Sequence, residues 1–319
     1  MNFSILGTGS ALPVCIKTND DLSKIVDTND EWISTRTGIK ERRICGEEPL
    51  SDIASVAASN ALENAGINAA DLDLIICATI SGDYITPSLA CIIQSKIKAT
   101  CPAFDVSAAC TGFIYALDVA AGYFARGKFK KILIVAADAM SKLIDWKDRA
   151  TCVLFGDAAG AVVLTAGDDL LSIKLTATGD ATALSAPNVT GNCPFGQIPQ
   201  TQPYLSMNGQ EIYKFAVSAM CNDITDVVNE AGLTKDQIDY VLPHQANIRI
   251  IEAAQKRLKM AKDKYLTNIK SYGNTSAVSI PLLLDDANRS GKFKKGDLLA
   301  LSAFGAGLTT GACVIRWNK

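Results

Sequence analysis

The fold of this chain is indicated by residues 61–76, ALENAGINAADLDLII, which return at residues 227–242 as VVNEAGLTKDQIDYVL. Each copy reads as a helix that ends at an Ala-Gly pair, a short polar turn and then a buried strand. The pentapeptide GKFKK also occurs twice, at 127–131 and 291–295, each time after a long apolar segment and before a β-like run. Because internal repeats decide the architecture, we expect a duplicated α/β protein with halves at residues 1–170 and 171–319.

Strands and helices are expected to alternate along the chain. The apolar runs that favour strands lie at residues 74–78, 132–137, 161–165, 240–242, 298–301 and 313–315. Residues 179–202 are rich in Thr, Asn, Pro and Gly, and they read either as the connection between the halves or as a loop over a site.

The repeat also aligns residues of the two halves. Cys110 lies 17 residues before Gly127, and Asn274 lies 17 residues before Gly291, so the two occupy equivalent positions. His244 directly follows an apolar run that reads as a strand. Since ligands of open α/β sheets bind outside the carboxyl ends of strands, a pseudo-twofold arrangement would bring these three loops together.

His244 is the only histidine in the chain. A histidine metal cluster is therefore excluded, as is any mechanism that needs two imidazoles. A lone histidine at a strand end is often purely structural, but its position relative to Cys110 and Asn274 favours a functional role.

The segment after Cys110 predicts a buried helix. From residue 111 to 126 the only charged residues are Asp118 and Arg126, and a helix that is apolar almost all round is buried. The helix at 276–288 is its expected neighbour. A thiol in the first turn of a helix is expected to have a lowered pKa and to act as a nucleophile; the alternative is a small, inert, buried side chain.

Composition narrows the class of protein. The chain has 319 residues, 48% of them hydrophobic, and a net charge of −2, so a global attraction to nucleic acid or to a membrane is not expected. The first residues lack the basic start of a signal peptide, and no apolar stretch is long enough to span a bilayer. The ten cysteines include no C-x-x-C pair, which favours reduced thiols in the cytoplasm.

Five motifs together resemble β-ketoacyl-acyl carrier protein synthase III. They are AFDVSAAC (103–110), FGDAAG (155–160), PHQAN (243–247), YGNTS (272–276) and AFGAG (303–307), in order and with matching spacing. The resemblance covers the whole chain, and five motifs are far more specific than one. It implies a thiolase-like fold, a duplicated αβαβα five-layer architecture with pseudo-twofold symmetry, in a homodimer.

The resemblance also implies the chemistry. An acyl-CoA primer would acylate Cys110, and malonyl-acyl carrier protein would then lose CO₂, its enolate held by His244 and Asn274. The backbone N–H groups of Cys110 and Ala306 would form the oxyanion hole, and Phe304 would keep water out. No metal or redox cofactor is implied.

Substrate-binding residues follow from the same resemblance. Coenzyme A is expected at Thr28, Trp32, Arg36 and Arg149, with its pantetheine arm beside Gly209 and Asn247. The acidic carrier protein is expected on a basic patch of Lys214, Arg249, Lys256 and Arg257, three of them on an amphipathic helix at 247–260 whose buried stripe is Ile250, Ile251, Ala254 and Leu258. For the charged residues, an ordinary solvated surface is the competing interpretation.

The chain departs from the family at two positions. Thr86 stands where family members often carry a large aromatic residue, contributed across the dimer to the partner's primer pocket, although Tyr84 or Ile85 could fill that space. Thr310 stands where a tryptophan is common. These differences leave the primer open, and acyl transfer to an amine or alcohol, or a silent scaffold that binds carrier protein, remain as alternatives.

Overall fold

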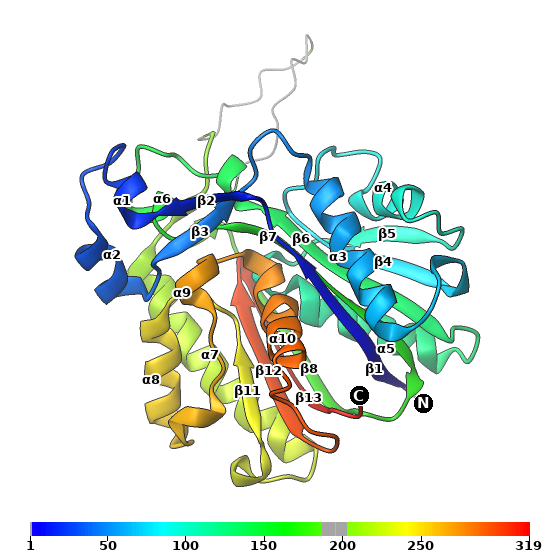
Figure 1. Ribbon diagram of the computed structural model, residues 1–319. Helices are drawn as coiled ribbons and strands as arrows, with labels where there is room; N and C mark the ends of the chain where they lie inside the picture. The colour runs from blue at the N-terminus through cyan, green and yellow to red at the C-terminus, as the bar shows by residue number, and fades with distance from the viewer. Residues whose placement is uncertain (1, 187–194, 196–202) are drawn as a thin grey trace.

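The computed structural model describes residues 2–186, 195 and 203–319, and its core contains two mixed β-sheets (Figure 1). The first sheet has the strand order β1-β7-β6-β4-β5. The bounds of its strands are β1 Asn2–Ala11, β4 Leu74–Ala78, β5 Ala103–Val106, β6 Lys131–Ala139 and β7 Asp157–Gly167. Strand β4 is parallel to β5 and β6, whereas β7 is antiparallel to β1 and β6.

The second sheet repeats this arrangement with the order β11-β12-β13-β8. Its strands are β8 Leu170–Asp180, β11 Tyr240–Pro243, β12 Leu298–Gly305 and β13 Gly307–Arg316. Strand β11 is parallel to β12, and β13 is antiparallel to β12 and β8. A parallel bridge from Val241 to Tyr265 stands where β5 stands in the first sheet.

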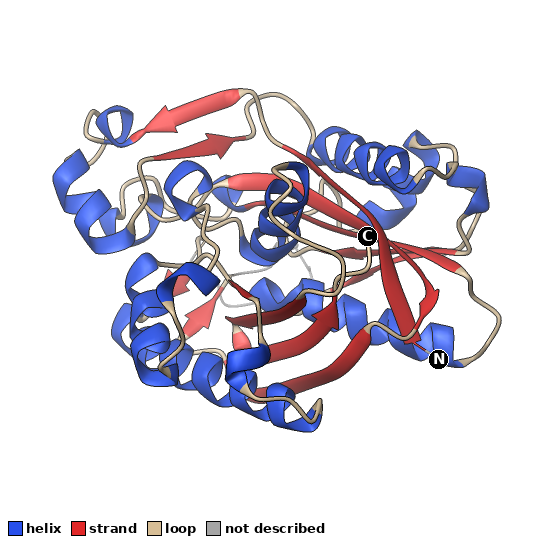
Figure 2. Ribbon diagram, turned by 60° about the horizontal axis from the view of Figure 1, so that its bottom comes forward, coloured by secondary structure: helices blue, strands red, loops and turns tan. Residues whose placement is uncertain are grey.

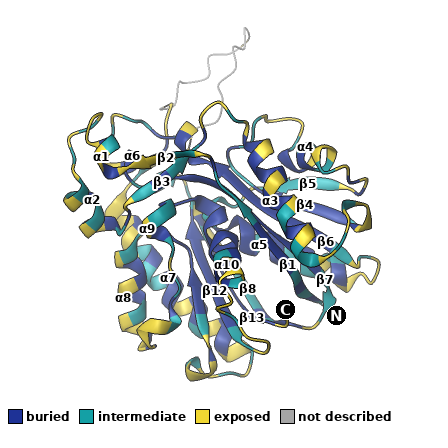
Figure 3. Ribbon diagram, viewed as in Figure 1, coloured by how far each residue is buried: buried dark blue, intermediate teal, exposed yellow. Residues whose placement is uncertain are grey.

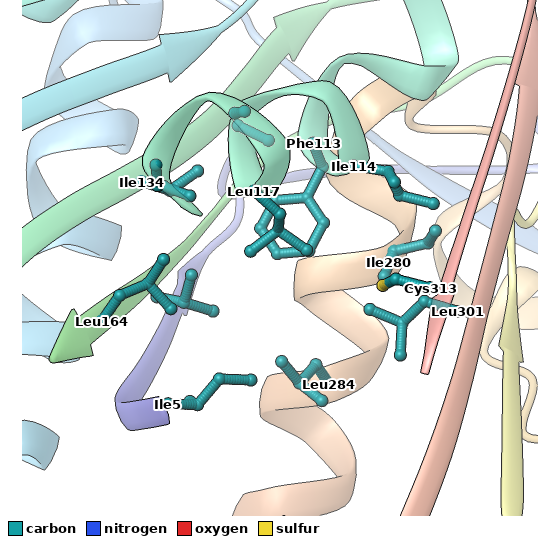
Figure 4. Packing of buried hydrophobic residues seen from close by; sticks show 14 of the residues in the cluster. Ile5, Phe113, Ile114, Leu117, Ile134, Leu164, Ile280, Leu284, Leu301 and Cys313 are labelled. Carbon is teal, nitrogen blue, oxygen red and sulfur yellow. The ribbon is translucent and has the colours of Figure 1, made fainter. Parts of the chain in front are cut away.

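Two helices, α5 (Gly112–Ala125) and α10 (Ser279–Arg289), fill the space between the sheets. Figure 2 shows the two groups of strands separated by helices. Each fully buried Leu, Ile or Phe side chain in this layer stabilises the folded state by about 1.5–3 kcal/mol. The layer therefore holds the two halves together. Figure 4 shows residues of both sheets and both helices in contact: Ile5, Phe113, Ile114, Leu117, Ile134, Leu164, Ile280, Leu284, Leu301 and Cys313.

Four further helices cover the outer faces of the sheets. Helices α3 (Leu50–Ala65) and α4 (Leu89–Lys96) pack on the first sheet, and α7 (Gly209–Glu230) and α8 (Ile248–Leu258) pack on the second. Buried residues concentrate in the sheets and central helices, and exposed residues lie on the outer helices (Figure 3). The layers therefore follow the predicted order of α, β, α, β and α.

The remaining elements are short. Two small antiparallel two-stranded sheets pair β2 (Cys15–Thr18) with β3 (Glu41–Ile44) and β9 (Leu184–Ser185) with β10 (Ser206–Met207). The others are α1 Asn19–Leu22, α2 Asp30–Thr37, α6 Arg149–Cys152, α9 Ile269–Tyr272, and the 3₁₀ helices η1 Ala69–Asp71, η2 Ala109–Thr111, η3 Met140–Lys142, η4 Lys235–Gln237, η5 Lys262–Lys264 and η6 Ser276–Val278. No helix within the described residues is long and apolar enough to cross a membrane.

Backbone angles confirm the repeat that the sequence predicts. Gly66 after α3 and Gly232 after α7 both have φ of +68°, and Gly127 and Gly291 have +71° and +66°. Glycine adopts this left-handed conformation at no steric cost, which explains why it recurs at these helix ends.

All six predicted strands are present, each within or equal to an observed strand. Among the strands of the two large sheets, sequence reasoning missed β5, which is only four residues long, and the whole of β8, whose outer half is polar. Of the predicted loop at 179–202, residues 179 and 180 end β8, and residues 184 and 185 form β9. Apart from residue 195, residues 187–202 lie outside the described residues.

Candidate active site

The two repeats enclose a cavity of about 300 Å³, and Cys110, His244 and Asn274 all line it. Cys110 follows β5 in the first repeat. His244 follows β11 and Asn274 follows α9 in the second repeat. The structure therefore brings together three residues that lie far apart in the sequence.

Cys110 lies in η2, the single turn that joins β5 to α5. Ala109 directly before it has φ of +46°, a left-handed conformation that costs a non-glycine residue about 1–3 kcal/mol. Gly305 lets β12 approach this turn closely, because a Cβ atom there would lie 2.8 Å from the Cys110 backbone nitrogen. The local geometry thus presses the start of α5 against the second sheet.

The Cys110 thiol has a pKa raised to about 12, chiefly because it is removed from bulk solvent; the nearby Asp138 carboxyl raises it further, and the Ser276 hydroxyl lowers it. The pKa is therefore raised, whereas the position at a helix N-terminus had predicted that it is lowered. Burial penalises the thiolate more than the Ser276 hydroxyl and the Cys110 backbone N–H stabilise it. At neutral pH the resting group is a thiol.

The matching turn of the second repeat is η6, which opens at Ser276 with φ of +55° as η2 opens at Ala109, so Cys110 aligns with Ala277 and the predicted equivalence of Cys110 and Asn274 was wrong by three residues. Asn274 lies two residues before η6. Its backbone nitrogen donates to the Leu154 carbonyl at 2.8 Å, which ties the turn to the first repeat. Its side-chain Oδ1 accepts the Ser276 backbone N–H at 2.9 Å. Because that oxygen is occupied, the Nδ2 amide group is left as a hydrogen-bond donor.

His244 is 1% exposed, and its backbone nitrogen donates to the Ser302 carbonyl of β12 at 2.8 Å. The ring Nδ1 lies 2.7 Å from the Ser279 hydroxyl. Phe304 packs edge-on against the ring, with centroids 5.2 Å apart. Burial lowers the pKa of His244 to about 3, so the imidazole is neutral under physiological conditions.

Two backbone N–H groups lie beside these side chains. Neither Cys110 nor Ala306 has a hydrogen-bond partner for its backbone nitrogen within the described residues. The Thr309 hydroxyl lies 2.9 Å from the Ala306 carbonyl and 3.3 Å from the Ala108 carbonyl. Thr309 therefore links the two turns that carry the free N–H groups.

One wall of the cavity carries most of the predicted coenzyme A residues. Trp32, Arg36, Gly209 and Asn247 line it, whereas Thr28 and Arg149 do not. The guanidinium groups of Arg36 and Arg149 nevertheless lie 4.6 and 4.8 Å from the centroid of the Trp32 ring. The stack of an indole and two guanidinium groups offers a flat, cationic surface.

The predicted basic patch lies on α7 and α8, which pack against each other. Lys214, Arg249, Lys256 and Arg257 are all exposed. Of these only Arg249 lines the cavity. The buried stripe of α8 is formed by the four predicted residues, Ile250, Ile251, Ala254 and Leu258.

Apolar side chains that sequence reasoning did not identify line the rest of the cavity: Ile80, Met140, Phe155, Leu184, Leu205 and Met207. Thr86 is exposed and does not line the cavity of its own chain. Thr310 is buried, and its hydroxyl lies 2.6 Å from that of Thr176. The missed residues are ordinary core types in sequence, so only their position around the cavity distinguishes them.

Five layers, a duplicated sheet and a Cys-His-Asn cavity between the repeats define a thiolase-fold condensing enzyme. A family model for 3-oxoacyl-(acyl-carrier-protein) synthase III matches residues 104–179, and the model for its C-terminal part matches residues 228–317. The chain belongs to this family of acyltransferases, which initiate fatty acid synthesis by condensation.

Full-length relatives carry the same assignment. The β-ketoacyl-(acyl-carrier-protein) synthase III of Clostridium acetobutylicum is 48% identical, over 99% of this chain and 98% of its own length. That of Oceanobacillus iheyensis is also 48% identical, over 100% of both chains. The crystal structure of 3-oxoacyl-(acyl-carrier-protein) synthase III from Aquifex aeolicus superposes with a TM-score of 0.92 at 46% identity, covering 99% of this chain and 100% of its own. The predicted family, fold and enzyme class are thereby confirmed.

Proposed function

We propose that this enzyme condenses an acyl-CoA primer with malonyl-acyl carrier protein through an acyl-Cys110 intermediate. The observation that carries the proposal is the shared cavity, where one thiol faces two side chains whose other polar ends are already bonded to the protein. Such an arrangement suits a covalent nucleophile next to two fixed hydrogen-bond donors.

In the first step, Cys110 Sγ attacks the thioester carbonyl of acyl-CoA. The bond from the acyl carbon to the coenzyme A sulfur breaks, and the thiol proton of Cys110 leaves with that sulfur. Thiol and thioester simply exchange, so no net base is consumed. The backbone N–H groups of Cys110 and Ala306 hold the oxyanion of the tetrahedral intermediate, since both lack a partner within the described residues.

In the second step, malonyl-acyl carrier protein loses CO₂, and the electron pair of the broken bond forms an enolate. His244 and the Nδ2 group of Asn274 donate hydrogen bonds to the enolate oxygen. The enolate carbon attacks the acyl-Cys110 carbonyl, and collapse of the intermediate releases the β-ketoacyl product. Cys110 leaves as a thiolate and takes up a proton, which restores the thiol.

The wall with Trp32, Arg36 and Arg149 is proposed to bind the nucleotide of coenzyme A, with Thr28 alongside. An adenine ring would replace one guanidinium on the indole face, and the displaced arginine would then suit the phosphates. Gly209 and Asn247, which also line the cavity, are proposed to contact the pantetheine arm. Phe304 shields the reacting atoms from water.

The basic patch is proposed to dock the acidic carrier protein. Lys214 lies one helical turn before Ser218 on α7, and Ser218 accepts a hydrogen bond of 3.4 Å from Arg257 on α8. These contacts place cations of both helices on one face. Arg249 lies at the end of α8 that meets the cavity, so the patch continues to the site.

A cytoplasmic homodimer completes the proposal. Strand β5 is an edge strand with only β4 as its partner within the described residues, and edge strands favour pairing with another chain. Tyr84 and Ile85, next to Thr86, are 64% and 76% exposed, which suits a loop that reaches a second subunit. The nine cysteines within the described residues are all free thiols, as a reducing cytoplasm favours.

The test is the intact mass of the protein after exposure to a panel of acyl-CoAs, with the modified peptide mapped. An adduct on Cys110 supports the proposal, and the chain lengths that react define the primer that Thr86 and the apolar wall permit. Failure of every acyl-CoA to modify Cys110 would contradict it. Transfer of the acyl group to an amine or alcohol without CO₂ release would favour the alternative acyltransferase.

A further inference from the structure

The Ser279 hydroxyl has one hydrogen-bond partner within the described residues, the Nδ1 atom of His244 at 2.7 Å. Ser279 is the first residue of α10 and is 1% exposed, so water does not compete for this contact. Many other serines of this chain donate to a backbone carbonyl three or four residues earlier, as Ser55 does to Ser51. Ser279 has no such acceptor, so its proton has only the histidine nitrogen to bind.

A neutral imidazole carries one N–H, and the partner of one nitrogen decides which nitrogen holds it. Burial keeps His244 neutral, as its lowered pKa indicates. If the hydroxyl donates to Nδ1, then Nδ1 is the acceptor and the ring proton must be on Nε2. The Nε2 atom has no partner within the described residues, and His244 lines the cavity, so this N–H is available to a substrate.

We propose that Ser279 is a positioning residue that donates its hydroxyl proton to Nδ1 and thereby holds His244 as the Nε2–H tautomer. The inference rests on the proposed function, because the enolate oxygen requires a donor at Nε2. It also states what His244 does not do. A ring with its proton on Nε2 has no lone pair there to accept the thiol proton of Cys110, so acylation proceeds without His244 as the base.

The single histidine makes the test direct. Protein labelled with ¹⁵N-histidine gives the nitrogen signals of one ring, and long-range ¹⁵N–¹H couplings identify the protonated nitrogen. The wild-type chain is expected to show the proton on Nε2. Ser279→Ala is expected to lose this preference, and Ser279→Thr, which retains a hydroxyl, is expected to restore it. The spectrum requires no activity, so a failure here is distinct from a failure of the proposed function.

Kinetics provide the second readout. In Ser279→Ala, condensation is expected to fall about 10- to 100-fold, as for other losses of a group that orients a functional histidine, while acylation of Cys110 by acyl-CoA is unchanged. The matched control is Ser172→Ala, which removes a buried hydroxyl bonded at 2.6 Å to the Val227 carbonyl and does not touch the histidine. Ser172→Ala should lower the free energy of unfolding by a similar amount and change neither the condensation rate nor the acylation rate.

A proton on Nδ1 in the wild-type chain would overturn the proposal, even if Ser279→Ala does not fold. Retention of either the Nε2–H tautomer or the wild-type condensation rate in Ser279→Ala would overturn it as well. A parallel loss of acylation would show that the substitution damages the site in general, which contradicts the assigned role.

Discussion

The turn that carries Cys110 and the turn that follows Asn274 share one backbone design, but the site side chains are held differently. Ala109 and Ser276, the first residues of η2 and η6, have φ of +46° and +55°, and each turn leads directly into a central helix. Asn274 is held by the Ser276 N–H, and His244 beside it is held by Ser279. The Cys110 thiol has the Ser276 hydroxyl and its own backbone N–H as polar neighbours, which lower the thiol pKa without offsetting burial.

The proposed mechanism divides the reaction between the two repeats. The second repeat supplies donors whose direction is fixed before substrate arrives, which is what stabilisation of a developing charge requires. In the same mechanism the first repeat supplies the nucleophile, which forms and then breaks a bond to the acyl group. A rigidly held thiol would reach the acyl carbon less easily, whereas donors that are free to turn would stabilise the enolate less.

The largest expected effect comes from a substitution in the first repeat. Cys110→Ala should remove acylation by acyl-CoA and reduce condensation by at least about 1,000-fold, because no other thiol lines the cavity within the described residues. Intact mass and CO₂ release measure the two steps. Cys91→Ala, which changes an exposed free cysteine, is the control and should leave both unchanged.

Substitutions in the second repeat should separate the two steps. His244→Ala and Asn274→Ala each remove one donor and should lower condensation by about 100- to 1,000-fold, while Cys110 is still acylated. The acyl adduct should then accumulate in the presence of malonyl-acyl carrier protein. Failure of acyl-CoA to acylate either variant would contradict the assignment of acylation to the first repeat and enolate stabilisation to the second.

The raised pKa of Cys110 predicts how the reactivity of this thiol depends on pH. Because burial raises the pKa to about 12, the thiolate fraction should rise about tenfold for each unit of increasing pH below that value. Alkylation of Cys110 by iodoacetamide should therefore accelerate about 100-fold from about pH 7 to about pH 9 without a plateau. A plateau near neutral pH would show that the helix N-terminus outweighs burial after all. Peptide mapping separates Cys110 from Cys91.

The smallest expected effects concern two glycines near α5. Gly305→Ala would place a Cβ atom 2.8 Å from the Cys110 nitrogen, so the turn must shift, and condensation should fall by about tenfold or more. Gly122→Ala in the exposed face of α5 meets no atom within 4 Å. It should stabilise the protein by about 0.5–1 kcal/mol and leave the rates unchanged. Denaturant unfolding and steady-state rates compare the two, and equal behaviour would contradict the close approach of β12.

Much of the fold and of the candidate site could be predicted from the sequence, because repeats and motifs are local patterns. The repeat at 61–76 and 227–242 predicted the duplicated sheets. The glycines at 127 and 291 predicted that the segments after Cys110 and Asn274 are both central helices, but they misaligned the two residues by three positions. Other features depend on distances that no pattern encodes. Ser279 matters because it lies 2.7 Å from a ring 35 residues away, and the pKa of Cys110 depends on how deeply the folded chain buries the thiol.

The residues that line the cavity also include some that the sequence predicts and some that only the structure identifies. Trp32 was predicted from the family resemblance and Asn247 lies in one of its motifs, and both line the cavity. Ile80, Met140 and Leu205 were not predicted, because an apolar residue that faces a cavity is indistinguishable in sequence from one that fills the core. Thr86 remains a prediction, since it can reach a primer pocket only in a second subunit.

The central claim is that an acyl group on Cys110 is consumed by an enolate formed beside His244 and Asn274. The most direct measurement isolates the acyl-enzyme, adds malonyl-acyl carrier protein and follows the mass of the Cys110 peptide and the release of CO₂ in one turnover. The account predicts that the adduct disappears and CO₂ appears together, in equal amounts, with a β-ketoacyl carrier protein as product. An adduct that persists, or that is discharged without CO₂, would contradict it.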